Sequence, residues 1–253
     1  MKKALSYLLV YVGIQLCVGA IVPPLWMHIT GSSDRTVAML ISTTAVASAI
    51  TIAVFLLARW AEVSPRWLRS RQWGVLLWSG LAALGALIPS AWIQEQMPEL
   101  PNLMEQEFEM IIANRWGYVC IGLLAPIAEE IAFRGAILRS LLGRFSTWTA
   151  ICLSAFLFAL VHMNPAQMPH AFIIGILLGW MYYRTGSILP SMTFHWVNNS
   201  VAYIIYNLFP NPDLKLIDLF KGSELHVLMA VGFSLLILLP AVYQLHLWMK
   251  RAE

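Results

Sequence analysis

Three short groups of polar residues interrupt apolar segments in the second half of the chain, and their chemistry would suit hydrolysis. In chain order they are Glu129 and Glu130 with Arg134, then Phe158 with His162, then His195 with Asn199. A charged side chain at the centre of a bilayer costs roughly 3 kcal/mol on insertion scales, so charges in apolar segments usually mark a functional site. These three groups are therefore the first candidates for the site.

The first group contains two carboxylates that the helical repeat separates. Glu130 and Arg134 are four residues apart, so they lie on one helix face and can form an ion pair. Glu129 points about 100° away from Glu130 around the helix and stays free for another task. We expect Glu130 with Arg134 to be structural and Glu129 to be available for chemistry.

The other two groups could complete a hydrolytic site. Glu129 and the imidazole of His162 could converge on one water and remove its proton, which is general-base catalysis. His195 and Asn199 are also four residues apart, so their side chains could together donate hydrogen bonds to the oxyanion. Such donors are each worth roughly 3 kcal/mol of transition-state stabilisation.

The sequence shows no serine or cysteine motif that would indicate a nucleophile other than water. The sequence has no G-x-S-x-G turn, and none of its cysteines has a histidine neighbour. Cys17, Cys120 and Cys152 each lie in an apolar segment, which is typical of packed small side chains rather than of a disulfide framework or a zinc site.

The composition predicts that membrane helices position these residues. Hydrophobic residues make up 59% of the 253 residues and charged residues only 11%. The pattern predicts an all-α polytopic bundle, one membrane domain over 1–253, with about eight spans. The spans are expected near 6–29, 37–58, 73–93, 116–138, 147–163, 169–183, 187–208 and 225–248. The fifth and sixth are short, which suggests helices tilted, packed inside the bundle or opening onto a cavity.

Basic residues predict the orientation. With both termini cytoplasmic, eleven basic residues fall inside and four outside, as the positive-inside rule requires. The inner set is Lys2, Lys3, Arg59, Arg66, Arg69, Arg71, Arg139, Arg144, Arg184, Lys250 and Arg251. The acidic segment 94–115 is then an outer loop, the net charge of +3 reflects topology, and no basic groove for nucleic acid is visible. Counting along 116–138 places Glu129 in the cytoplasmic half.

The three groups resemble the CAAX protease and bacteriocin-processing (CPBP, or Abi) family of intramembrane proteases. The family signature is E-E-x-x-x-R, then F-x-x-x-H, then H-x-x-x-N or H-x-x-x-D on successive core helices, and all three match here in order. The surrounding HMNPAQ and GWMYYRTGSILPS resemble bacterial members. The match covers about 116–205, which is the expected catalytic core.

The resemblance implies an endopeptidase in a bacterial inner (plasma) membrane that acts on a membrane-associated protein or peptide. By position, Glu129 would activate water with His162, and His195 with Asn199 would form the oxyanion site. Glu130 would pair with Arg134 to hold the helix, and Phe158 would be a further supporting residue. The family is often labelled metalloprotease, and a zinc ion could in principle bind Glu129, His162 and His195. The H-E-x-x-H spacing is missing, so we expect no cofactor.

Other readings stay open at this stage. Glu130 with Arg134 alone is more often a helix-packing clip than a catalyst, and Asn198 with Asn199 could join helices. His170 and the remaining histidines are expected at wetted interfaces. A Glu–His–Arg set would also suit a proton-coupled transporter, although the chain shows no inverted repeat. A third alternative is a non-catalytic immunity or scaffold protein of the same fold.

Overall fold

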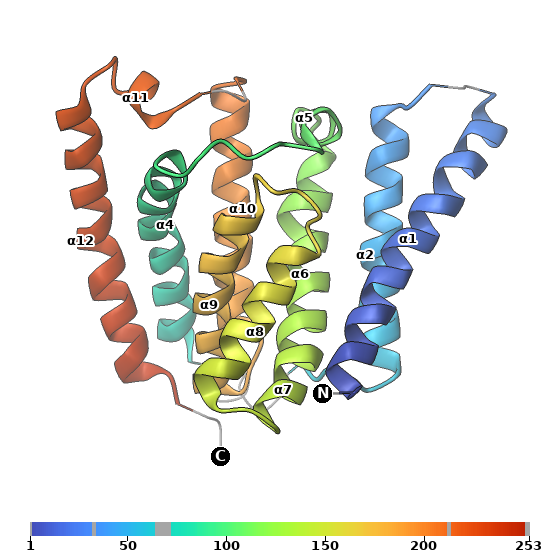
Figure 1. Ribbon diagram of the computed structural model, residues 1–253, viewed down its shortest axis with the longest axis horizontal. Coiled ribbons are helices and arrows are strands. Elements are labelled where there is room, and N and C mark those ends of the chain that lie inside the picture. The colour runs from blue at the N-terminus through green and yellow to red at the C-terminus, as the bar shows by residue number, and fades with distance from the viewer. Residues whose placement is uncertain (1, 32–33, 64–71, 212–213, 251–253) are drawn as a thin grey trace.

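The regular secondary structure in the described part of the chain is all helical. The computed structural model describes residues 2–31, 34–63, 72–211 and 214–250, and these ranges contain helices, turns and coil but no strand (Figure 1). The all-α prediction is therefore confirmed. Four predicted cytoplasmic basic residues, Arg66, Arg69, Arg71 and Arg251, lie outside the described residues.

Helices occupy each of the eight segments in which spans were predicted. Four are long and apolar enough to cross a membrane, namely α1 (Lys2–Thr30), α2 (Val37–Leu57), α4 (Trp73–Glu95) and α12 (Glu224–Trp248). The others include α8 (Thr147–Leu160), α9 (Met168–Thr185) and α10 (Leu189–Leu208). These findings support an integral membrane protein, while the number of spans beyond four stays a prediction.

The helical run that carries the two glutamates is irregular. It consists of η1 (Val119–Leu124), α6 (Ala125–Glu130), η2 (Ile131–Leu138) and α7 (Arg139–Leu142), and both η segments have the wide turns of a π-helix. The Ala125 N–H donates to the Cys120 carbonyl, five residues back. Pro126 has no N–H, so the Ile121 carbonyl, five residues before it, receives no bond from that position. Turns of this kind are frequent at functional sites.

Buried small residues bring the neighbouring helices close to this run. Every residue of η2 is buried, and η2 packs against α1, α8 and α9. A Cβ atom at Gly175 of α9 would lie 3.0 Å from the Ala155 Cβ atom and 3.4 Å from Phe158 Cδ1 of α8. Glycine therefore allows α9 to approach α8 closely beside the run.

Two short helices lie at the end of the bundle opposite the termini (Figure 1). They are α5 (Glu105–Ile112) and α11 (Leu216–Leu219). Helix α5 contacts α2 and α10, and Glu107 on it pairs with Arg35 across 2.9 Å. The segment 94–115, expected to be a connection without a folded domain, thus includes a helix that packs on the bundle.

Candidate active site

A buried ion pair lies at the centre of the bundle. Arg134 Nη1 donates to Glu130 Oε1 over 2.9 Å, and the side chains are only 1% and 0% exposed. Arg134 Nη2 donates to the Gly175 carbonyl over 3.3 Å, and its guanidinium carbon lies 4.4 Å from the centroid of the Phe158 ring. The predicted pair is present. Its charge is balanced within the bundle, as a buried cation requires.

His195 lies between the two glutamates. Its Nδ1 atom is 3.0 Å from Glu130 Oε1, and its Nε2 atom is 3.6 Å from Glu129 Oε2. An ionised carboxylate only accepts hydrogen bonds, so Nδ1–H donates to Glu130. With Nδ1 protonated, a second proton is needed between Nε2 and Glu129 for that contact to be attractive. Glu130 thus does more than pair with Arg134, because it also fixes the ring of His195 relative to Glu129.

His162 follows α8 and bonds back to it. Its Nδ1 atom lies 2.8 Å from the Phe158 carbonyl oxygen, which can only accept. Nδ1 therefore carries a proton, and in the neutral ring Nε2 keeps its lone pair. The Phe158 ring meets the His162 ring edge to face with centroids 4.9 Å apart and the His195 ring with centroids 5.9 Å apart. Phe158 thereby sets the spacing of both imidazoles.

Two hydrogen bonds fix the side-chain amide of Asn199. Its Nδ2 atom donates over 3.1 Å to the carbonyl of Ile121, which lies five residues before Pro126 in the chain. Its Oδ1 atom accepts from Asn198 Nδ2 over 3.3 Å. These two contacts fix the amide plane and leave one Nδ2–H of Asn199 for another acceptor.

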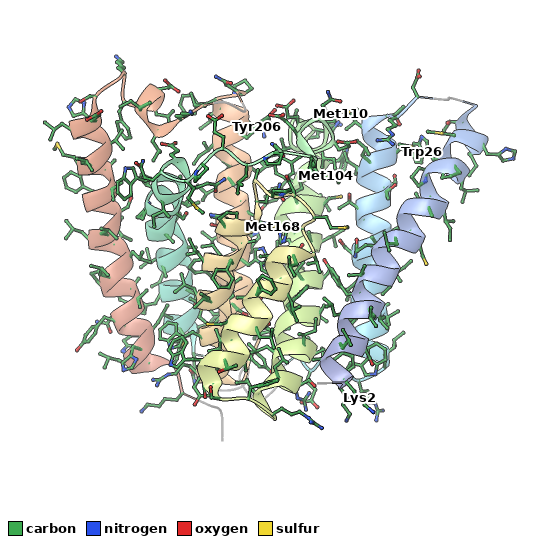
Figure 2. All side chains as sticks on the ribbon, in the orientation of Figure 1. Lys2, Trp26, Met104, Met110, Met168 and Tyr206 are labelled. Carbon is green, nitrogen blue, oxygen red and sulfur yellow. The ribbon has the colours of Figure 1, made fainter. Side chains whose placement is uncertain are left out.

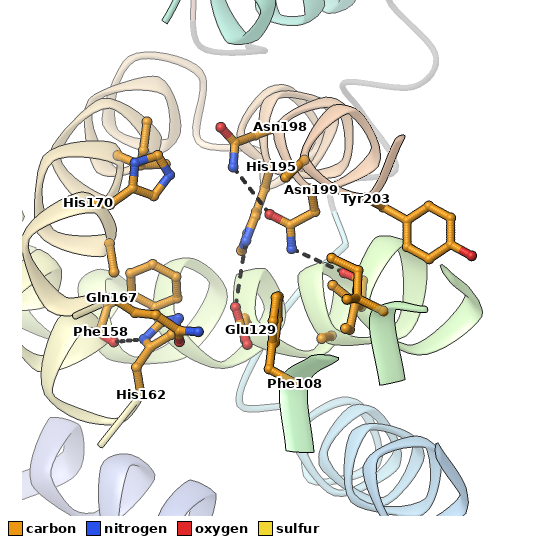
Figure 3. Close-up of a pocket in the computed structure, with 16 residues that line it drawn as sticks. Phe108, Glu129, Phe158, His162, Gln167, His170, His195, Asn198, Asn199 and Tyr203 are labelled. Carbon is orange, nitrogen blue, oxygen red and sulfur yellow. Dashed lines mark hydrogen bonds and ion pairs between the residues drawn. The ribbon is translucent and has the colours of Figure 1, made fainter. Parts of the chain in front are cut away.

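One cavity brings the four predicted catalytic side chains together. It has a volume of about 290 Å³, and its lining includes Glu129 from α6, His162 after α8, and His195 and Asn199 from α10 (Figure 3). The lining also includes Phe158, whereas Glu130 and Arg134 are not part of it. The arrangement places a carboxylate, two imidazoles and an amide around a small space lined otherwise mainly by apolar side chains.

Sequence reasoning missed some residues of this cavity. Gln167, His170, Asn198 and, from α5, Phe108 also line it (Figure 3). The expectation that His170 is a wetted interfacial residue was wrong, because the turn after α8 leads directly into α9 and places the first turn of α9 in the cavity wall. The available signal was the shortness of the fifth and sixth predicted spans.

The depth of Glu129 in the membrane stays a prediction, and the structure adds how the cavity lies in the bundle. The sequence count placed Glu129 nearer the end of the bundle that carries the termini. Phe108 and Ile112 of α5 line the cavity, and α5 lies at the end of the bundle opposite the termini (Figures 1 and 3). The count assumed a regular helix and did not foresee that α5 packs over the cavity.

The candidate metal ligands are not arranged so that three of them could bind one metal ion. In the ranges that the structure describes, no group of three or more His, Cys, Asp or Glu side chains is close enough to share a metal ion. The alternative zinc set of Glu129, His162 and His195 is therefore not assembled, although all three line one cavity. A tetrahedral zinc needs its ligand atoms at about 2.0–2.2 Å from the ion, which a shared cavity alone does not provide.

With the all-α bundle, its four long apolar helices and its carboxylate-containing cavity described, the chain can be compared with known protein families. Residues 112–201 match the family described as type II CAAX prenyl endopeptidase Rce1-like. Residues 112–201 are therefore similar to this peptidase family, and the resemblance seen in the three motifs is confirmed.

A more distant relative is similar over part of the chain. UPF0177 protein YxdF of Lactococcus lactis subsp. lactis (strain IL1403) is 30% identical over 102 residues, which are 40% of this chain and 51% of that protein. The chain thus matches about half the length of this curated relative. No solved structure matches the chain significantly.

Proposed function

We propose that this protein is an intramembrane endopeptidase in which Glu129 activates water for attack on a peptide bond. The observation that carries the proposal is the position of His195, which contacts Glu129 and Glu130 on opposite edges of its ring at the wall of the cavity. A purely structural clip would need Glu130 and Arg134 alone. It would not need a second carboxylate and an imidazole facing open space.

The catalytic cycle assigns one role to each group. Glu129 takes a proton from a water that His162 Nε2 orients, and the water oxygen bonds to the peptide carbonyl carbon. The electron pair of the C=O bond moves to the oxygen, where the free N–H of Asn199 and protonated His195 stabilise the charge. When the C–N bond breaks, the proton on Glu129 passes to the leaving amine. The products are a free acid and a free amine.

The substrate class follows from the setting of the cavity. The cavity lies within a bundle whose outer surfaces are apolar, so a substrate peptide has to enter from the bilayer or its interface. We propose a membrane-associated protein or peptide as substrate. The oligomeric state plays no part in this proposal.

The proposal is tested by comparing peptides in cells that express the wild-type protein or the Glu129→Gln variant at matched levels. Peptides released from membrane proteins by the wild type should be missing with the variant, and their uncut precursors should accumulate. Purified protein in lipid nanodiscs should then cut a synthetic peptide copied from that precursor. A transporter or a non-catalytic scaffold would give no new peptide termini in either measurement.

Asn199→Ala should mainly lower kcat, by about a hundredfold, because it removes an oxyanion donor that acts in the transition state. The cleavage rate of the synthetic peptide at saturating concentration measures this effect. Asn207→Ala, two turns further along α10 and outside the cavity lining, removes an amide that donates to the Ile112 carbonyl. It serves as the matched control and should leave kcat within a few-fold, whereas equal losses in both variants would refute the oxyanion role.

Chelation should leave activity unchanged, since the candidate donors are not grouped for a metal. The measurement is the cleavage rate after dialysis against a strong chelator, alongside the metal content of the active protein. Stoichiometric zinc that is lost together with activity and restored by zinc alone would contradict this expectation. It would leave the peptidase proposal intact.

A further inference from the structure

The cavity lies toward the end of the bundle that carries α5 and α11. Phe108 and Ile112 of α5 and Tyr203 of α10 form its wall on that side (Figure 3). Figure 2 shows Met104, Met110 and Tyr206 at this end and Lys2 at the other. No residue of the first or last turns at the terminal end lines the cavity. The cavity therefore lies nearer the α5 end than the end with the termini.

The two ends of the bundle differ sharply in charge. The end with the termini carries basic residues and one carboxylate among those the structure describes, namely Lys2, Lys3, Arg59, Arg139, Arg144, Arg184 and Lys250 with Glu62. The α5 end is acidic, with Asp34, Glu95, Glu99, Glu105, Glu107, Glu109, Asp218 and Glu224 against Arg35, Arg115, Lys215 and Lys221.

This difference in charge predicts which side of the membrane the cavity faces. Loops rich in lysine and arginine stay on the cytoplasmic side of a membrane. Arg139 and Arg144 lie at the end of the helical run that carries the two glutamates, after η2. Their charge therefore predicts the orientation of that run itself. The basic end is then cytoplasmic, and the α5 end with the cavity faces the outside.

We infer that the catalytic cavity takes its substrate from the non-cytoplasmic face of the membrane, so that the substrate is an exported peptide or the outer segment of a membrane protein. This inference rests on the proposed function and narrows its substrate class. A tail attached to the inner leaflet would have to approach Glu129 from the end of the bundle opposite α5.

The surface beside the cavity has space for the polar part of such a substrate. A depression of about 670 Å³ lies between the end of α4, the segment before α5 and the first turn of α9. Ala166 and Pro169 line the depression, while the intervening Gln167 and His170 line the cavity. One turn of chain therefore separates the two spaces, and a peptide lying across that turn would contact both.

Thiol labelling tests the orientation without any assumption about catalysis. In a protein whose Cys17, Cys120 and Cys152 are replaced by alanine, Phe108→Cys reports on the cavity mouth, Glu105→Cys on its outer rim and Arg144→Cys on the opposite end. A membrane-impermeant maleimide added to intact spheroplasts should label the first two variants at once and Arg144→Cys only after permeabilisation. Labelling of Arg144→Cys from outside, with Phe108→Cys protected, would overturn the inference.

The location of the substrate provides an independent test. Precursors that accumulate with the Glu129→Gln variant should be digested by a protease added to intact spheroplasts. Precursors that resist digestion until the cells are permeabilised would overturn the inference while supporting the peptidase proposal. If no precursor accumulates but the maleimide labels as expected, the peptidase proposal fails and the orientation of the cavity stands.

Discussion

Glu129→Gln is expected to lower kcat by about 10²- to 10⁴-fold and to leave the bundle folded, because the amide cannot accept the proton of the attacking water. The side chain lines the cavity and is 18% exposed, so the loss of its charge leaves no unpaired ion in the core. The glutamine keeps the size of the side chain and can still face His195 Nε2. The measurements are kcat for the synthetic peptide and the thermal unfolding temperature in detergent.

The matched control is Glu224→Gln, the same substitution at an exposed position in the first turn of α12. It should retain wild-type kcat. If Glu129→Gln keeps full activity at matched expression, another group removes the proton from water and Glu129 is not the base. If it loses activity only together with its fold, the carboxylate is structural.

Glu130→Ala is expected to destabilise the folded protein by about 3–5 kcal/mol, because it leaves a buried cation without its partner. Arg134 is 1% exposed and has one carboxylate within ion-pair distance among the described residues, so no water or other anion can replace the lost contact easily. The yield of folded protein and the unfolding midpoint in denaturant measure the effect. The reorientation of His195 should lower kcat in the fraction that folds.

A double substitution separates the two roles of Glu130. Replacing both Glu130 and Arg134 by methionine removes the ion pair without leaving a lone charge, which is often neutral for stability. The double variant should fold better than Glu130→Ala and still be inactive, since His195 has lost its acceptor. Full stability of Glu130→Ala alone would show that Arg134 is compensated elsewhere.

The sequence was sufficient for those features that depend on local periodicity. Long apolar segments predicted helices at α1, α2, α4 and α12, and the spacing of four residues predicted the contact of Glu130 with Arg134. Helical spacing also placed His195 and Asn199 on one face of α10, where both line the cavity. In each case the helix repeat alone fixes the geometry.

Features that depend on packing between helices could not be predicted from the helical repeat. The repeat of an ordinary helix separates neighbours by about 100°, which suggested separate tasks for the two glutamates. His195 nevertheless contacts both, because its two ring nitrogens lie on opposite edges of one ring. The placement of α5 and His170 at the cavity likewise depends on tertiary contacts that no spacing encodes.

Pro126 and Asn199 form a complementary pair across two helices. The proline withdraws a donor from the Ile121 carbonyl, and the asparagine supplies one from α10. An ordinary residue at 126 would offer its own N–H to that carbonyl and compete with Asn199 for it. The orientation of the Asn199 amide therefore depends in part on a missing backbone hydrogen in another segment. A designed protein that uses this site on a regular helix would therefore need the proline at the position of Pro126 as well as the side chains of the site.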